Sequence, residues 1–124
     1  MRTKHSKFLQ IGLVAAVLAL LISGCSSDNI DMAKVNAVLD VRTPSEFAAG
    51  HLQGALNIDV EGPDFNSAVQ ALAKDGNYVV YCHSGRRAGL AIDQMHQIGF
   101  IGTLTNAGGI DAATNSTGLP VVTN

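Results

Sequence analysis

The most informative part of this sequence reads Tyr78-Val79-Val80-Tyr81-Cys82-His83-Ser84-Gly85-Arg86-Arg87-Ala88. Its first four residues are continuously apolar and rich in aromatic and branched side chains, which is typical of a strand covered on both faces. A polar loop with one glycine follows Cys82. Apolar residues then recur at steps of three and four, which predicts an amphipathic helix that begins near Arg87. The stretch therefore predicts a strand, a loop and a helix, with the cysteine where the strand ends.

The rest of the chain repeats this alternation of short apolar runs and helical segments, which indicates parallel strands joined by crossover helices. The expected strands cover residues 37–41, 55–60, 78–81 and 102–105. The expected helices begin after Thr43, after Asp64 and near Arg87, and end before Gly50, Gly76 and Gly99. We therefore expect a small three-layer α/β domain over residues 32–124, with a central, mostly parallel sheet and helices on both faces.

Composition excludes several other classes of protein. The chain has 124 residues, of which 47% are apolar and only 15% charged, so it is not a disordered chain. Its two cysteines allow at most one disulfide, which excludes a disulfide-stapled mini-protein. Its length corresponds to one globular domain.

The first 24 residues predict an export signal. Three basic residues and no acid precede an apolar run over residues 11–22, and small residues follow, which is the form of a signal peptide. The run is shorter than the ~20 apolar residues of a membrane-spanning helix. Its end, Leu21-Ile22-Ser23-Gly24-Cys25, resembles the lipobox of bacterial lipoproteins, in which the cysteine is lipidated and becomes the mature N-terminus. An ordinary secretory signal with an incidental cysteine is the alternative.

Lipidation at Cys25 would make residues 25–31 a polar tether and anchor the protein in the bacterial cell envelope, on the periplasmic side. Ser26 after the cysteine favours the outer membrane. Cleavage would remove basic residues and none of the ten acidic ones, so the mature chain is acidic. We expect no nucleic-acid partner, because phosphate binding needs a basic surface.

Lipidation of Cys25 would also leave Cys82 as the only free thiol, which is then either buried and inert or kept for chemistry. Ligands of open α/β sheets bind at the carboxyl ends of strands, where Cys82 stands. The loop and the helix start supply unpaired N–H groups and a helix dipole, which attract anions and lower the pKa of a thiol. Arg86 and Arg87 are the only charged residues nearby in the sequence, so we expect a local positive site for a small anion.

Four blocks of the sequence resemble, in order, those of the single-domain rhodaneses, a family of thiosulfate-type sulfurtransferases. The blocks are residues 39–47, residues 50–58, residues 81–87, and residues 106–110 with 118–121. The resemblance implies a rhodanese-like fold and a cysteine that accepts sulfane sulfur as a persulfide. Carried over by position, it implies that Cys82 is the nucleophile, that the cradle consists of His83, Ser84, Gly85, Arg86 and Arg87, and that Arg87 closes it.

The resemblance also implies the reaction and its partners. A small sulfur-containing anion such as thiosulfate would donate sulfur, cyanide or a thiol would accept it, and no metal or organic cofactor would be needed. We expect the chain to act as a monomer. Two other functions stay open: a sulfur-carrier or partner-binding module with little activity on thiosulfate, and a redox sensor built on one exposed thiol.

The spacing within the loop argues against a further alternative. Cysteine-based phosphatases and arsenate reductases of similar fold place five residues between the cysteine and the arginine, whereas four separate Cys82 from Arg87. Two positions depart from the rhodanese pattern. Gln53 stands where proline is common, and Ala113 where tryptophan is common, and we expect the second change to affect packing more than chemistry.

Three further residues are expected to support the site. Asp40 stands at a strand end and Arg42 follows two residues later, so both can hydrogen-bond neighbouring turns, and a general-base role for Asp40 is the alternative. His51 lies in a matching block and is expected to brace nearby loops. His83 is expected to line the pocket entrance and His96 to face water. We expect no zinc site, because the cysteine and the histidines lack a ligand spacing typical of zinc.

Overall fold

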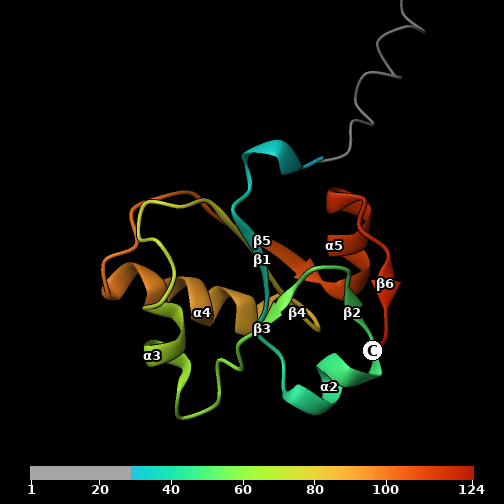
Figure 1. Cartoon of the computed structure of the whole chain (residues 1–124), viewed down its shortest axis with the longest axis horizontal. Coiled ribbons are helices and arrows are strands. Elements are labelled where there is room, and N and C mark those ends of the chain that lie inside the picture. The colour runs from blue at the N-terminus through green and yellow to red at the C-terminus, as the bar shows by residue number, and fades with distance from the viewer. Residues whose placement is uncertain (1–28) are drawn as a thin grey trace, which may run out of the picture.

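The structure, a computed structural model, describes residues 29–124 (Figure 1). The expected leader over residues 1–24, the expected lipidation site Cys25 and the start of the expected tether lie outside the described residues. The elements are, in chain order, the 3₁₀ helix η2 (Met32–Lys34), β1 (Ala37–Asp40), α2 (Pro44–Ala49), β2 (His51–Leu52), β3 (Leu56–Asn57), α3 (Phe65–Val69), β4 (Tyr78–Cys82), α4 (Arg86–Gln97), β5 (Leu104–Gly109), α5 (Ile110–Thr117) and β6 (Val121–Val122).

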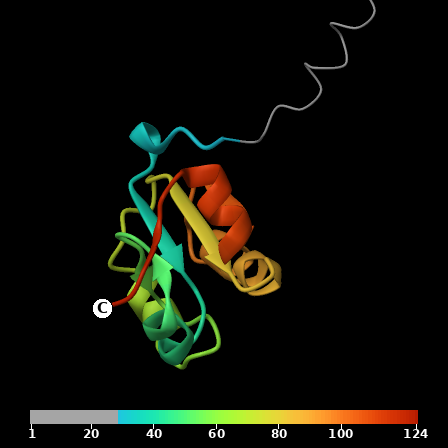
Figure 2. The ribbon, with the colours of Figure 1, turned by 90° about the vertical axis from the view of Figure 1, so that its right-hand side faces the viewer.

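Four strands form one parallel sheet in the order β3-β1-β4-β5. Every residue of β4 is buried, which explains why its sequence is apolar throughout. In Figure 2, β1 and β4 point in the same direction, away from the end of the domain where η2 lies. The carboxyl ends of both strands, and with them Cys82, therefore meet at the opposite edge of the sheet.

Helices cover both faces of this sheet, which confirms the expected α/β fold (Figure 1). Successive side chains of a strand point to opposite faces. Val80 and Cys82 of β4 belong to the core shared with α3 and α4. Val79 and Tyr81 belong to a second core on the other face, which includes Ala113 of α5. The sulfur of Cys82 and the phenol of Tyr81 are thus directed to different layers.

Local signals predicted two of the helices well. Thr43 caps α2, because its side chain accepts a hydrogen bond from the Glu46 N–H while the Glu46 carboxylate accepts one from the Thr43 N–H. Pro44 is the first helical residue and Gly50 the C-cap, as expected. Helix α4 begins at Arg86 and ends at Gln97, two residues before Gly99, as predicted.

Two predicted elements are shorter in the structure. The helix after Asp64 was expected to reach Gly76, but α3 ends at Val69. The Asp64 side chain forms no cap hydrogen bond. The amides of Ala71 and Leu72 bond to carbonyls only three residues back, so the chain continues in tight turns. The strand expected over residues 55–60 pairs only over Leu56–Asn57, alongside the last two residues of β1.

Other elements have bounds or partners that the sequence pattern did not predict. The expected strand 102–105 begins at Leu104 and extends to Gly109. Strands β2 and β6 form a separate antiparallel pair, in which His51 lies opposite Val122. Helix α5 follows β5 directly and covers the Tyr81 face of the sheet. Within residues 29–124 no helix combines the length and apolar character required to cross a membrane.

Candidate active site

Cys82 ends β4 and its side chain is fully buried. The chain then turns within three residues into α4, which the left-handed backbone of Gly85 (φ +100°) makes possible. The Gly85 N–H donates a hydrogen bond of 2.9 Å to the sulfur. The sequence therefore folds the loop around its own cysteine, with backbone donors directed at Sγ.

These donors determine the ionisation of the thiol. Burial raises the pKa of Cys82, but hydrogen bonds from the backbone N–H groups of Ala88, Ser84, Gly85 and Arg87 lower it, and the net pKa is below its ordinary value. A thiolate is the reactive form of cysteine. The main chain of the loop thus favours the thiolate form of Cys82, as the environment of a nucleophilic cysteine does.

The side chains of the loop behave differently from its amides. His83, Ser84 and Arg86 are exposed to solvent, so they border the sulfur from outside. Within the described part of the chain, no carboxylate lies within 4.0 Å of Arg86. Arg86 is therefore the cation of this loop that is available to an incoming anion.

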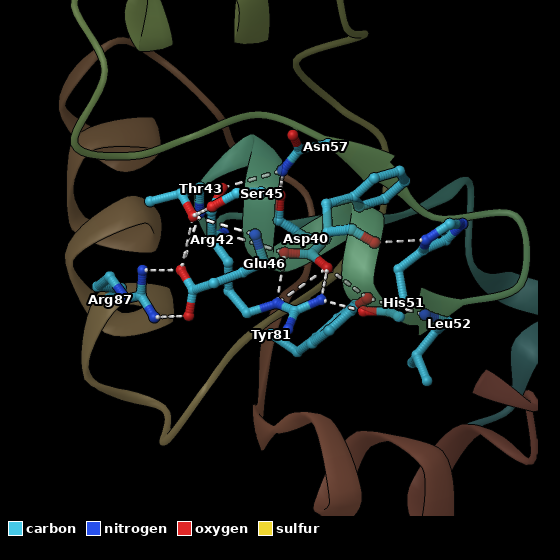
Figure 3. A network of polar contacts seen from close by, with 12 residues as sticks. Asp40, Arg42, Thr43, Ser45, Glu46, His51, Leu52, Asn57, Tyr81 and Arg87 are labelled. Atoms are coloured by element: carbon cyan, nitrogen blue, oxygen red, sulfur yellow. Dashed lines mark hydrogen bonds and ion pairs between the residues drawn. The ribbon is translucent and has the colours of Figure 1, made fainter. Parts of the chain in front are cut away.

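Arg87 is paired with Glu46, a residue of α2 for which the sequence predicted no role at the site (Figure 3). Its Nη1 and Nη2 donate to Glu46 Oε1 at 2.8 Å and Oε2 at 3.0 Å, and Glu61 Oε1 lies 3.9 Å from Nη1. The hydrogen bond from Arg87 is the largest cause that lowers the pKa of Glu46 to about 2. The expected closing role of Arg87 stays a prediction, and in the structure its guanidinium is paired with a carboxylate.

Asp40 and Arg42 lie at the centre of a buried network behind the site (Figure 3). Arg42 Nη2 donates to Asp40 Oδ2 and to the Gly50 carbonyl, each at 2.6 Å. The Tyr81 hydroxyl donates to Asp40 Oδ2 at 2.7 Å and accepts from the Leu52 N–H at 2.9 Å. Since Tyr81 and Cys82 point to opposite faces of β4, this network ties β1, β2 and β4 together without touching the sulfur, which supports a scaffold role.

His51 lies at the corner between α2 and β2. Its ring stacks on Phe47 with centroids 3.7 Å apart, and its Nδ1 lies 2.9 Å from the Phe47 carbonyl oxygen. Only 5% of His51 is exposed. These contacts are those of a residue that braces a corner. His96 is exposed on α4, and within residues 29–124 no three His, Cys, Asp or Glu side chains are grouped so that they could hold a metal ion.

The end of β5 supports the loop from its other side. Gly109 lies opposite Cys82 across a register shift, and a Cβ placed on Gly109 would overlap the His83 carbonyl oxygen. Asn106 Nδ2 donates to the Gly85 carbonyl at 3.0 Å, and Asn106 Oδ1 accepts from the Gly108 N–H at 2.9 Å. In the sequence, Asn106 and Gly109 stand out only as part of a block that resembles those of the rhodaneses. The pair of glycines at the end of β5, Gly108 and Gly109, is the sequence signal of this close approach.

Together these features define a class: a small α/β domain whose buried cysteine is held by loop amides at the carboxyl end of a parallel strand. Comparison with known proteins agrees with it, since a model of the rhodanese-like domain matches residues 26–116. The chain belongs to the rhodanese-like family.

Individual relatives carry names from the same family. The chain is 33% identical over 72 residues to thiosulfate sulfurtransferase PspE of Escherichia coli, a match that covers 58% of this chain and 68% of that protein. It is 36% identical over 92 residues to the chloroplastic thiosulfate sulfurtransferase 16 of Arabidopsis thaliana, covering 66% and 76% of the two chains. A solved rhodanese with anions from E. coli aligns with a TM-score of 0.58 and 30% identity, over 71% of this chain and 98% of that one.

Proposed function

We propose that this protein is a sulfurtransferase that moves sulfane sulfur from a thiosulfate-like anion, through a persulfide on Cys82, to a thiol or cyanide. One observation carries the proposal: backbone N–H groups of the loop are directed at the buried Cys82 sulfur, that of Gly85 at 2.9 Å, and they lower its pKa. Membership of the rhodanese-like family and relatives named as thiosulfate sulfurtransferases support the same reaction.

The reaction is a double displacement on one sulfur atom. The Cys82 thiolate attacks the outer sulfur of thiosulfate, a new S–S bond forms, and the bond to the sulfonate sulfur breaks, so sulfite leaves with the electron pair. The acceptor thiolate or cyanide then attacks the outer sulfur of the persulfide, and the Cys82 thiolate leaves. Atoms and charge balance in both steps, and neither step requires a metal or organic cofactor.

The loop amides have a role in each step. They are fixed by the fold before the reaction and are directed at the position where negative charge resides, on the thiolate or on the persulfide. A preorganised donor of this kind typically contributes ~3 kcal/mol to the stabilisation of an anionic species in a transition state. Arg86, exposed beside the loop, supplies the charge that would draw the anionic donor toward the sulfur.

Intact mass after incubation with thiosulfate tests the proposal. We expect the protein to gain the mass of one sulfur atom, and the added atom to disappear when cyanide is supplied. Cys82→Ser, which replaces only the sulfur, should gain none. An adduct on Cys82→Ser, or no adduct on the unmodified protein, contradicts the proposed reaction. Sulfur uptake from a persulfidated protein but not from thiosulfate would instead favour the carrier function.

We also propose that the protein is exported and anchored to the bacterial cell envelope, on its periplasmic side, through a lipid on Cys25. The support comes from the lipobox-like sequence. Such an anchor would join the domain near η2, where the Ile30 N–H donates to the Ser116 carbonyl, at the end of the sheet opposite Cys82. The sulfur would then face away from the membrane.

Metabolic labelling with a fatty-acid analogue tests the anchor. We expect the label to appear on the protein in a bacterial host and to be lost in Cys25→Ala, while Cys82→Ser keeps it. A Cys25→Ala protein that stays in the membrane fraction would contradict lipid anchoring.

A further inference from the structure

We propose that Glu46 is a positioning residue of this site. Its carboxylate accepts hydrogen bonds from both terminal nitrogens of Arg87, compensates the positive charge of the guanidinium and keeps it from hydrogen-bonding to the Cys82 sulfur. The inference rests on the proposed role of Cys82 as the nucleophile. On this proposal the loop amides, rather than the side chain of Arg87, stabilise the negative charge on the Cys82 sulfur.

The geometry of the pair carries the proposal. Two parallel hydrogen bonds, 2.8 Å and 3.0 Å long, join the guanidinium of Arg87 to the carboxylate of Glu46, the bidentate arrangement that is strongest for this pair of groups. The Arg87 side chain is 14% exposed, so it is shielded from competing water. Among the described residues, the donors to Cys82 Sγ are main-chain N–H groups, of which that of Gly85 lies 2.9 Å from the sulfur.

Glu46 is itself fixed in place. Its Oε1 accepts hydrogen bonds from the Thr43 N–H at 3.1 Å and the Thr43 hydroxyl at 3.0 Å, as part of the cap of α2. Rotation of the carboxylate away from Arg87 would therefore also break the hydrogen bonds that it accepts from Thr43 at the start of α2. The pair thus links α2 to α4 rigidly, and it determines where the last residue of the loop lies.

The charges around the pair support neutralisation. Glu61 approaches the same guanidinium at 3.9 Å, so two carboxylates face one cation. The titratable and charged groups of the site, from every element that meets it, are Cys82 of β4, His83 of the loop, Arg86 and Arg87 of α4, Glu46 of α2 and Glu61 of the segment after β3. The positive charge of Arg87, which interacts with Cys82, is consequently opposed by two carboxylates.

Neutralisation of Arg87 affects how well the thiolate reacts. A thiolate loses nucleophilicity as its pKa falls, with a Brønsted coefficient of about 0.4–0.5. The loop amides lower the pKa of Cys82 and so raise the fraction of thiolate. An unpaired cation beside the sulfur would lower the pKa further and slow the attack of the thiolate. Glu46 therefore sets the balance between the amount of thiolate and its reactivity.

The rate of Cys82 alkylation by iodoacetamide, measured across pH, tests this role. Glu46→Gln keeps the size and an acceptor for the Thr43 N–H but removes the charge. We expect the midpoint of the alkylation profile to fall by about half to one pH unit, because the charge of Arg87 is then no longer compensated by Glu46. We expect the plateau rate at high pH to fall by up to about threefold, because the more stable thiolate attacks more slowly.

Three variants serve as controls. Glu46→Asp retains the charge and should keep the midpoint near that of the unmodified protein. Glu61→Gln removes a more distant and more exposed charge and should shift it less. In an Arg87→Gln background, Glu46→Gln should produce a smaller shift, because its cationic partner is gone. Urea unfolding of each variant establishes that it is folded.

Two outcomes would overturn the proposal. One is an unchanged or raised midpoint in folded Glu46→Gln, and the other is an equal shift with and without Arg87. The alkylation profile reports on the thiol alone and requires no sulfur transfer. Failure of the positioning role is therefore distinguishable from failure of the proposed activity, which the mass experiment measures.

Discussion

Asp40→Asn should lower the free energy of unfolding by about 3–5 kcal/mol, the usual cost of removing one partner of a buried ion pair. Asp40 is fully buried, and its carboxylate accepts hydrogen bonds from the Arg42 guanidinium and the Tyr81 hydroxyl. Asparagine has nearly the same shape, so packing is preserved while the Arg42 charge is left buried without its counter-ion. Domains of this size are stable by only about 5–15 kcal/mol, so the loss is a large part of the total.

Urea unfolding at neutral pH measures this change. Asp31→Asn is the matched control, since Asp31 forms an exposed ion pair with Lys34 at 3.9 Å. Such surface pairs contribute between nothing and about 1 kcal/mol. A loss below about 1 kcal/mol in Asp40→Asn, comparable to that of the control, would show that the network does not hold the strands together.

Much of the fold follows from patterns that are local in sequence. The capping box at Thr43 and the helical spacing of α4 each involve residues within one or two turns of each other, so a short window contains all the interactions that form them. The apolar run of β4 is also a short local pattern, and it predicted a strand that is covered on both faces. Cys82 was placed at a strand end by this pattern alone.

The parts that the sequence did not reveal depend on pairs far apart in the chain. Glu46 and Arg87 are separated by 41 positions, as are Asp40 and Tyr81. Each pair meets only because β1 and β4 lie side by side with their carboxyl ends at one edge. Strands β2 and β6 have two residues each, too few for a periodic pattern, so their pairing also depends on tertiary structure.

Ala113 occupies a position where tryptophan is common in rhodaneses. The small residue was expected to alter packing there. In the structure it is fully buried in the core with Tyr81 and Leu52. The residue next to it, Thr114, has a buried hydroxyl without a hydrogen-bond partner in the described part of the chain. The effect of the alanine on stability stays a prediction.

Gly109→Ala should slow persulfide formation on Cys82 by about 100-fold, because a displacement of about 1 Å in a catalytic loop can cost this much. The backbone of Gly109 is extended (φ −81°, ψ 174°), so any residue can adopt its conformation. Space is what excludes a side chain, since the added Cβ would overlap the His83 carbonyl oxygen. The loop must therefore move, and its amides lose their alignment with the sulfur.

The rate at which thiosulfate adds sulfur, followed by mass, measures this effect. Gly89→Ala is the matched control. Gly89 lies in α4, and a Cβ there meets only Asn106 Nδ2 at an ordinary contact distance of 3.7 Å. Alanine within a helix is more stable than glycine by about 0.5–1 kcal/mol, so this variant should gain stability and keep its rate within about twofold. Equal rates for the two variants would mean that the approach of β5 to the loop does not align the amides. A selective loss in Gly109→Ala would place the end of β5 among the elements on which the chemistry depends.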